Sequence, residues 1–252
     1  MALHRGQPVE ASSEYEEFER HNEIFASDLH AGKELDLLRW QDVLERSGCD
    51  FLYCIGNIIS ALPSDLRSRT IDTISQFANS SDWNVRDSVA RVLGHCGQQR
   101  VLPLLRHLLA DPEEGLVRLA AVKGLMNLGY TFTPSERQRL LNDSSGMVRA
   151  EAAQIYVEQG EIEPVRELLR SRDSQNRLIA AEALIRGGFR DVAGEISDIL
   201  ENEDLSRRVD AVRLLQMSGD RRYIPLLASA EADPKDVVRS AAARAIQVLQ
   251  RS

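Results

Sequence analysis

The residues of this sequence whose types could do chemistry gather in one stretch, SDWNVRDSVARVLGHCG, which covers residues 81–97. It contains a carboxylate at Asp82, a guanidinium at Arg86, an imidazole at His95 and a thiol at Cys96. A thiol beside an imidazole is a pair that cysteine nucleophiles use. Adjacent residues of a helix point about 100° apart, however, so a helical segment does not let His95 and Cys96 face each other.

The stretch is one copy of a tandem repeat. Its arginine recurs at intervals of 32, 31, 28, 31 and 31 residues, and a small or β-branched residue follows each arginine three positions later. A glycine follows the first five arginines eleven positions later. A shared period of this kind indicates stacked supersecondary units rather than one reactive site. We name these six residues the ladder arginines: Arg86, Arg118, Arg149, Arg177, Arg208 and Arg239.

Each period is predicted to form two helices. The segment VLPLLRHLLAD, residues 101–111, has one apolar stripe at helical spacing, and Pro112 and Gly115 then interrupt the helix. A second helix follows and ends at Gly129, a position suited to a left-handed cap. Cys96 takes the place that Leu128 has in the next repeat, which indicates a core cysteine. No segment alternates apolar and polar residues with a period of two, so the pattern predicts an all-α protein.

The second helices carry the motif D-x-x-V-R-x-x-A-A-x-A-L-G-x-x-G, which resembles the HEAT-repeat family, especially the short-period HEAT-like repeats of the phycobilin lyases. The likeness covers roughly residues 64–250, and it implies a right-handed α-solenoid of HEAT-like helical hairpins, an α-α superhelix. In one copy the aspartate, Asp143, stands two positions further upstream than Asp82 does. The residues that match the motif best are Asp82, Val85, Arg86, Ala90, Leu93 and Gly97, followed by Asp143, Val148, Arg149, Ala152, Ala153 and Gly160.

The resemblance implies a structural role for the ladder. In this family the aspartates and arginines near the second helix stack from repeat to repeat, which assigns that role to Asp82, Asp173 and Asp204 beside the six ladder arginines. Each of these aspartates lies four residues before its arginine. A carboxylate at that point also meets the unpaired N–H groups at a helix N-terminus.

The repeats divide the chain into three parts. We expect residues 1–12 to be disordered, residues 13–33 to form an acidic helical cap, and residues 34–250 to form the repeat array. Ser13 and Glu16 have the spacing of a capping box. The segment 13–33 either shields the end of the array or docks a basic partner. Seven hairpins are expected, at 34–62, 64–97, 101–129, 132–160, 161–188, 190–219 and 221–249.

Composition narrows the function classes. The net charge is −8, and residues 1–50 carry 12 acidic and 5 basic side chains, so the repeat region is nearly neutral. Phosphate binding without a basic surplus is weak, which argues against nucleic acid as a ligand. The three cysteines match no disulfide framework and no zinc spacing. There is no apolar run of roughly 18 residues and no signal-peptide pattern, so we expect a cytoplasmic protein away from the membrane, monomeric when free.

The sequence lacks the motifs that identify enzymes built from such repeats. Deoxyhypusine hydroxylase, an enzyme with such repeats, holds iron with His-Glu dipeptides, and this sequence has none. We therefore expect no metal, no cofactor and no catalytic residue. A phycobilin lyase-like protein or tetrapyrrole chaperone stays open as an alternative because of the period length. A HEAT-like alkylpurine DNA glycosylase is a further alternative, although its basic groove is missing here.

The second helices are expected to line the concave face of the solenoid, where positions one, five and nine after each ladder arginine share a side. Long polar heads beside exposed aliphatics favour protein recognition there, and an ordinary solvated face is the other interpretation. The sequence thus favours a non-enzymatic protein-binding solenoid: an adaptor, an assembly factor, or an inhibitor such as a toxin-neutralising immunity protein. The expected contact residues are Arg91, Lys123, Asn127, Glu182, Arg186, Arg213, Met217 and Arg244, with Trp83 in a turn.

Overall fold

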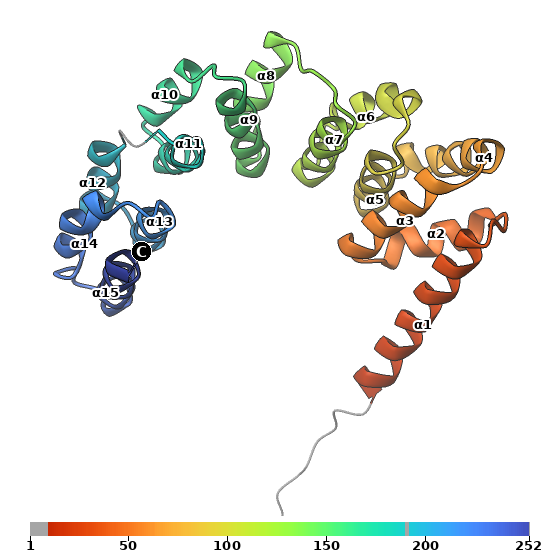
Figure 1. Cartoon of the computed structure of the whole chain (residues 1–252), viewed down its shortest axis with the longest axis horizontal. Helices are drawn as coiled ribbons and strands as arrows, with labels where there is room; N and C mark the ends of the chain where they lie inside the picture. The colour runs from red at the N-terminus through yellow and green to blue at the C-terminus, as the bar shows by residue number, and fades with distance from the viewer. Residues whose placement is uncertain (1–9, 190–191, 252) are drawn as a thin grey trace, which may run out of the picture. The chain divides into compact units, whose positions relative to one another are not determined.

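A computed structural model describes residues 10–189 and 192–251, with side chains from Glu17 onward. All regular structure in these residues is helical, as the repeat pattern predicts. The chain forms two compact units, Met1–Thr131 and Phe132–Ser252, which we call unit 1 and unit 2. Figure 1 shows that each unit is a stack of helical hairpins, so the predicted all-α solenoid is confirmed within each of them.

Unit 1 begins with one long helix and continues with paired helices. The described part of the segment expected to be disordered, residues 10–12, belongs to α1, and residues 1–9 lie outside the described residues. Ser13 therefore lies inside a helix that starts at Glu10 and is not its N-cap. The elements are α1 (Glu10–His30), α2 (Leu37–Arg46), α3 (Cys49–Ala61), α4 (Ser64–Ser75), η1 (Gln76–Asn79), α5 (Trp83–Gly94), η2 (Gln99–Val101), α6 (Leu102–Leu108) and α7 (Gly115–Asn127).

In unit 2 a shorter first helix alternates with a longer second helix. Its elements are α8 (Pro134–Leu141), α9 (Gly146–Glu158), α10 (Glu163–Leu169), α11 (Ser174–Arg186), α12 (Ala193–Asn202), α13 (Leu205–Met217), η3 (Arg221–Tyr223), α14 (Ile224–Ala230) and α15 (Asp236–Arg251). Among the described residues of both units, no helix is long and apolar enough to cross a bilayer.

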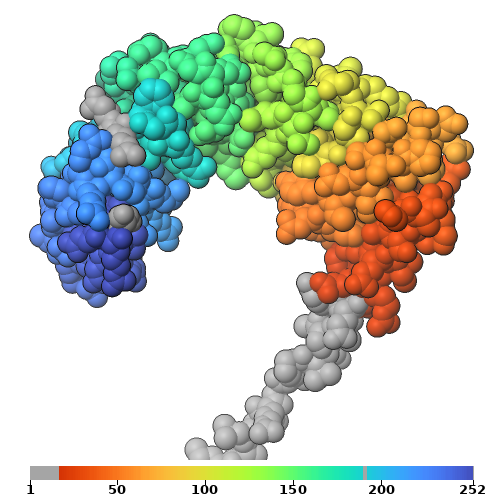
Figure 2. All heavy atoms as spheres, in the orientation of Figure 1, coloured from red at the N-terminus to blue at the C-terminus, as the bar shows by residue number. Residues whose placement is uncertain are grey.

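The second helices stack on one another and the first helices cover one side of them. In unit 2, α9 packs on α11, α11 on α13 and α13 on α15, while each first helix packs on its own second helix. The repeated small residue makes this stacking possible, because it lets neighbouring helices approach closely. All six residues at that position are fully buried: Val89, Ala121, Ala152, Ala180, Ala211 and Ala242. Figure 2 shows the side chains of neighbouring helices in contact along each unit.

The repeated glycines end the second helices. Gly129 has a φ of 72°, the left-handed conformation predicted for it, and its N–H donates to the carbonyl of Met126. Such a φ costs an L-residue energy that glycine avoids. The same conformation recurs at the glycines of the other four copies: Gly97, Gly160, Gly188 and Gly219.

The carboxyl-terminal half of α1 packs against the first hairpin of unit 1. Phe25 is fully buried and meets the ring of Trp40 edge-on, with 4.9 Å between the ring centroids. Asn22 and Leu29 are also buried, so one side of α1 faces the unit. This part of α1 therefore covers the side chain of Trp40 on the α2–α3 hairpin.

Candidate protein-binding face

The ladder arginines are occupied inside the fold. Each donates from Nη1 to a carbonyl in the turn before its own helix, for example Arg86 to Ser80 at 2.8 Å and Arg118 to Asp111 at 2.9 Å. Arg86 also donates from Nε to Oδ2 of Asp111, in the next repeat, at 2.7 Å. The Arg86 and Asp111 side chains are only 10% and 5% exposed, so this pair is withdrawn from partners.

Asp111 shows how one repeat is attached to the next. Its carboxylate accepts from Arg86 and from the backbone N–H groups of Glu113 and Glu114, and its carbonyl accepts from Arg118. Burial opposes ionisation of this carboxyl, but the hydrogen bonds from Arg86 and the two N–H groups outweigh it and lower its pKa. Asp111 therefore stays charged as the carboxylate partner of the ladder.

Unit 2 contains the same arrangement. Asp233 accepts from Nε of Arg208 at 2.8 Å and from the backbone N–H of Lys235, and its carbonyl accepts from Arg239. In the other two rungs of this unit, Arg149 donates to Oδ1 of Asn176 at 2.8 Å, and Arg177 pairs with Glu203 and Asp198.

The aspartates that the resemblance assigned to the ladder have a different role. Asp82 accepts from the N–H of Asn84, Asp173 from that of Gln175, and Asp204 from that of Arg207. Each is the N-cap of its own second helix, the local role that its position also predicts. The carboxylates that pair with Arg86, Arg177 and Arg208 lie elsewhere, and sequence spacing did not identify them: Asp111, Glu203 and Asp233.

Two hollows beside the ladder belong to the fold rather than to a site. One, of about 330 Å³, is lined by Arg86, Asp111 and Pro112, and the other, of about 440 Å³, by Arg208, Asp233 and Pro234. The three residues of the second hollow each lie 122 positions after the corresponding residue of the first. A feature that recurs with the repeat register is a product of the repeat, so neither hollow marks a specialised function.

Arg91 is not a surface cation, which corrects its expected place on the binding face. Its side chain is 12% exposed and pairs with Asp87 at 2.6 Å. It also donates to the hydroxyl of Tyr53 on α3 at 2.6 Å. The side chain of Asp87 is likewise only 12% exposed, so this stretch of α5 is covered by the neighbouring hairpin.

The His95–Cys96 pair is also part of the interior. Cys96 is fully buried, as the repeat register predicts, and burial raises the pKa of its thiol. His95 stacks on Tyr53, with 4.5 Å between ring centroids, and its Nδ1 lies 3.0 Å from the carbonyl of Arg91. Both residues have packing partners and neither is arranged as a nucleophile and base.

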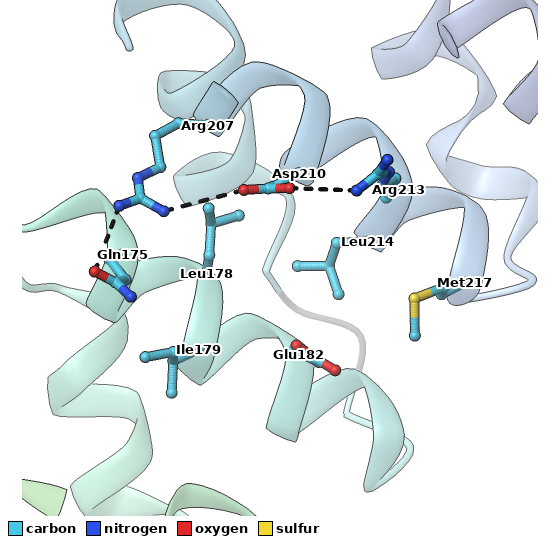
Figure 3. A pocket seen from close by; sticks show the side chains of 9 residues that line it. All are labelled: Gln175, Leu178, Ile179, Glu182, Arg207, Asp210, Arg213, Leu214 and Met217. Carbon is cyan, nitrogen blue, oxygen red and sulfur yellow. Dashed lines mark hydrogen bonds and ion pairs between the residues drawn. The ribbon is translucent and has the colours of Figure 1, made fainter. Parts of the chain in front are cut away.

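A groove between α11 and α13 brings several of the expected contact residues together (Figure 3). It encloses about 280 Å³. Its apolar lining consists of Leu178, Ile179, Leu214 and Met217, and its polar lining of Gln175, Glu182, Arg207, Asp210 and Arg213. Glu182, Arg213 and Met217 were predicted from the sequence, and Leu178 lies at position one after Arg177, on the predicted side of the helix, whereas Ile179 was not predicted.

The exposure of the groove residues matches a contact surface. Met217 is 61% exposed at one end of the groove, and the Arg213 side chain is 72% exposed with its nearest carboxylate, Asp210, 3.9 Å away. Asp210 also lies 4.0 Å from Arg207. Separations of this length between partly exposed groups hold the side chains only weakly, so they can turn toward a partner.

A second hollow, of about 160 Å³, lies between α9 and α11. Ile179 and Glu182 line both hollows, so the two form one surface across α11. Glu182 pairs with Arg186, four residues later, at 2.7 Å. We call the surface formed by α9, α11, α13 and α15 the second-helix face of unit 2.

The remaining predicted residues lie apart from this groove. Lys123 and Asn127 are exposed on α7 in unit 1, where Asn127 donates to the carbonyl of Gly94 at 2.7 Å. Arg244 is exposed on α15. Trp83 is the first residue of α5 and is half-buried, so it is less available than an exposed turn residue. Among the described side chains, no group of three or more His, Cys, Asp or Glu residues is placed to hold a metal ion.

Comparisons with known proteins agree with the repeat geometry. The family model for HEAT repeats matches residues 56–126 and 162–247. A search of curated protein sequences finds no significant match. Among solved structures, the YibA protein of Escherichia coli is 16% identical over all of both chains, with a TM-score of 0.50.

Two further solved structures are similar at lower scores. The CpcE–CpcF complex of phycocyanin lyase from Nostoc is 17% identical, with a TM-score of 0.44, over 86% of this chain and 95% of the matched one. Human deoxyhypusine hydroxylase in complex with glycerol is 15% identical, with a TM-score of 0.39, over 98% of this chain and all of the other. Similarities at these identities concern the fold alone.

Proposed function

This chain belongs to the HEAT-repeat family, and from that premise we propose that it is a non-enzymatic protein-binding module. Its second-helix face in unit 2 recognises a partner protein, and the chain acts as an adaptor, an assembly factor or an inhibitor. The observation that carries the proposal is the groove between α11 and α13, where the exposed Met217 and the half-buried Leu178 and Ile179 lie among loosely held charges.

The chemistry of the groove supports a protein partner. Interfaces combine an apolar centre with a polar rim and are enriched in methionine and arginine. Leu178, Ile179 and Leu214 supply the apolar centre, and Arg213 supplies an exposed guanidinium. Met217 adds a flexible, polarisable side chain that adapts to the shape of a partner.

The division of labour among the arginines supports the same proposal. The ladder arginines spend their donors on carbonyls and carboxylates of the fold, so they fix the spacing of the second helices. Arg213 and Arg244, in contrast, are exposed on the face that this spacing creates. The ladder supplies rigidity, and the exposed residues supply recognition.

The test is capture of a stoichiometric partner by the full chain, compared between two matched variants. Met217→Lys places a charge in the groove, whereas Met147→Lys places it at a similarly exposed methionine near the start of α9, outside the residues that line the two hollows. We expect Met217→Lys to lower partner capture at least tenfold, because it buries a charge in an apolar contact. Met147→Lys is expected to leave capture within about twofold, since surface changes away from a contact cost little.

Two results would overturn the proposal. One is equal capture by the wild-type chain and Met217→Lys. The other is capture that is lost equally in both variants, which would locate the contact elsewhere or reveal general damage. Arg91→Glu is unsuitable as a probe because Arg91 is ion-paired within the fold.

A further inference from the structure

Resting on the proposed function, we infer that the partner presents an amphipathic α-helix that crosses the second-helix face of unit 2. This helix carries apolar residues seven positions apart. Its basic end lies over α9 and its acidic end over α13 and α15.

The groove between α11 and α13 and the hollow between α9 and α11 are spaced so that a helix fits both of them and a strand does not. The hollows lie on either side of α11 and share Ile179 and Glu182. Packed helices are about 8–10 Å apart, so neighbouring furrows are separated by about that distance. A helix rises about 1.5 Å per residue, and residues seven apart lie about 10.5 Å apart on the same side.

An extended segment does not match this spacing. A strand rises about 3.3 Å per residue, and residues on one side of it are two or four apart, at about 6.6 or 13 Å. Neither value fits adjacent furrows. The residue three positions away has the right separation but points to the opposite side.

The charges on the face set the orientation of the occupant. At the α9 end, Glu158 is exposed and accepts a hydrogen bond from the neutral amide of Gln154 at 3.0 Å. On α11, Glu182 and Arg186 neutralise each other at 2.7 Å. On α13, Arg207 and Arg213 share one carboxylate, Asp210, which leaves an excess of one positive charge.

The fourth helix continues this order. Arg244 is exposed on α15, five positions after its ladder arginine, in line with Arg213 on α13. The acidic residue of α15 closest to this row in sequence, Asp236, pairs with Arg239 at 2.9 Å in the first turn of the helix. The face is therefore acidic at α9 and basic at α13 and α15, and a complementary helix carries the opposite order. A segment with one uniform sign of charge meets repulsion at one of the two ends.

The experiment uses the full chain and two synthetic helical peptides of roughly 20 residues, long enough to cross four helices at this spacing. Both peptides carry leucine at positions seven apart and have the same number of Lys and Glu residues. In the polarised peptide, Lys fills one end and Glu the other. In the interspersed peptide, the two alternate. Binding is measured by fluorescence anisotropy at low and at physiological salt.

We expect the polarised peptide to bind about tenfold more tightly at low salt, which corresponds to two or three exposed ion pairs. Arg213→Glu is expected to remove this preference, because it takes away the positive charge that faces the acidic end of the polarised peptide. The matched control, Arg139→Glu, makes the same charge change at an exposed residue of the first helix α8 and should preserve the preference.

Two results overturn the inference. One is equal binding of the two peptides, and the other is no detectable binding of either peptide at a concentration of about 1 mM. A preference that Arg213→Glu leaves intact also overturns it. If capture of the natural partner still depends on Met217 in that case, the proposed function stands and only the helical, polarised occupant is wrong. If capture is also insensitive to Met217→Lys, both proposals fail together.

Discussion

Replacing Asp111 by asparagine tests whether the ladder is a structural device. The carboxylate accepts four hydrogen bonds, two from Arg86 and one each from the N–H groups of Glu113 and Glu114. All four partners are donors. Whichever way an asparagine amide turns, its NH₂ group therefore faces a donor, and the guanidinium of Arg86 loses its buried counter-charge.

The loss of stability depends on the partners that Arg86 keeps in the variant. Removing one member of a buried ion pair costs about 3–5 kcal/mol. Arg86 keeps the carbonyl of Ser80 at 2.8 Å and the exposed carboxylate of Glu113 at 3.5 Å, so the lower part of that range applies. We expect Asp111→Asn to lower the free energy of unfolding of unit 1 by about 3 kcal/mol.

The assay is urea unfolding of the full chain followed by circular dichroism, with hydrogen exchange of α5 and α7 as the local readout, because repeat arrays can unfold in parts. Asp72→Asn is the matched control, since Asp72 pairs with Arg100 at 3.1 Å while its side chain is 65% exposed. The control should change stability by less than about 1 kcal/mol. The reasoning is refuted if both variants have the same effect, or if Asp111→Asn abolishes partner capture at unchanged stability.

The contribution of the Asp111 carboxylate to stability is expected to depend on pH. Its pKa is lowered in the folded chain, so its contribution to stability is complete above the unfolded pKa of about 3.9 and is lost as the pH falls through the folded value. The difference in stability between the wild-type chain and Asp111→Asn should be constant from pH 7 to about pH 5 and should shrink below about pH 4. A difference that grows on acidification would contradict this assignment.

The remaining predictions concern packing and reactivity. Gly94→Ala should destabilise unit 1 by about 1–3 kcal/mol in urea unfolding, because a Cβ there would overlap the Cα of Gly124; unchanged stability would show that the two helices can separate freely. In thiol labelling of the native chain, Cys49 and Cys54 should react rapidly and the buried Cys96 slowly, and equal rates for all three would contradict the burial of Cys96. Phe25→Ala should cost about 3–5 kcal/mol and speed hydrogen exchange in α1; unchanged exchange would exclude its packing role.

The period of the sequence determined most of the fold in advance. Helix ends, buried small residues and left-handed glycines all recur with the ladder arginine, so one correct repeat assigns the others. Gly129 and Ala121 are examples: glycine is suited to the left-handed end of the helix, and alanine is small enough for close helix packing. The first requirement is local to the helix end and the second comes from the stacked neighbour, but both recur in every repeat, so the repeat pattern reveals them directly.

Contacts between repeats were harder to predict. The partner of Arg86 is Asp111, 25 residues away, and the partner of Arg149 is the amide of Asn176, so no fixed offset or residue type identifies them. Arg91 occupies the same repeat position as Arg213, yet only Arg213 is exposed. Burial of Arg91 depends on Tyr53 from the preceding hairpin, a residue that the repeat pattern does not specify.

The close approach of α5 and α7 was missed for a related reason. Gly94 and Gly124 lie eight and six residues after their ladder arginines, so they occupy different repeat positions and the alignment does not reveal them as a pair. Only the structure brings their backbones together. The groove between α11 and α13 similarly depends on which side chains two helices contribute, and the sequence supplied some of them, Glu182, Arg213 and Met217, without the groove itself.

The most direct test of the account is a hydrogen-exchange footprint of the full chain alone and with its captured partner. Partner binding is expected to slow exchange in α11 and α13, residues 174–186 and 205–217, while the first helices α10, α12 and α14 exchange as in the free chain. Protection that falls on those first helices, or on α1 alone, would contradict the assignment of the second-helix face as the binding surface.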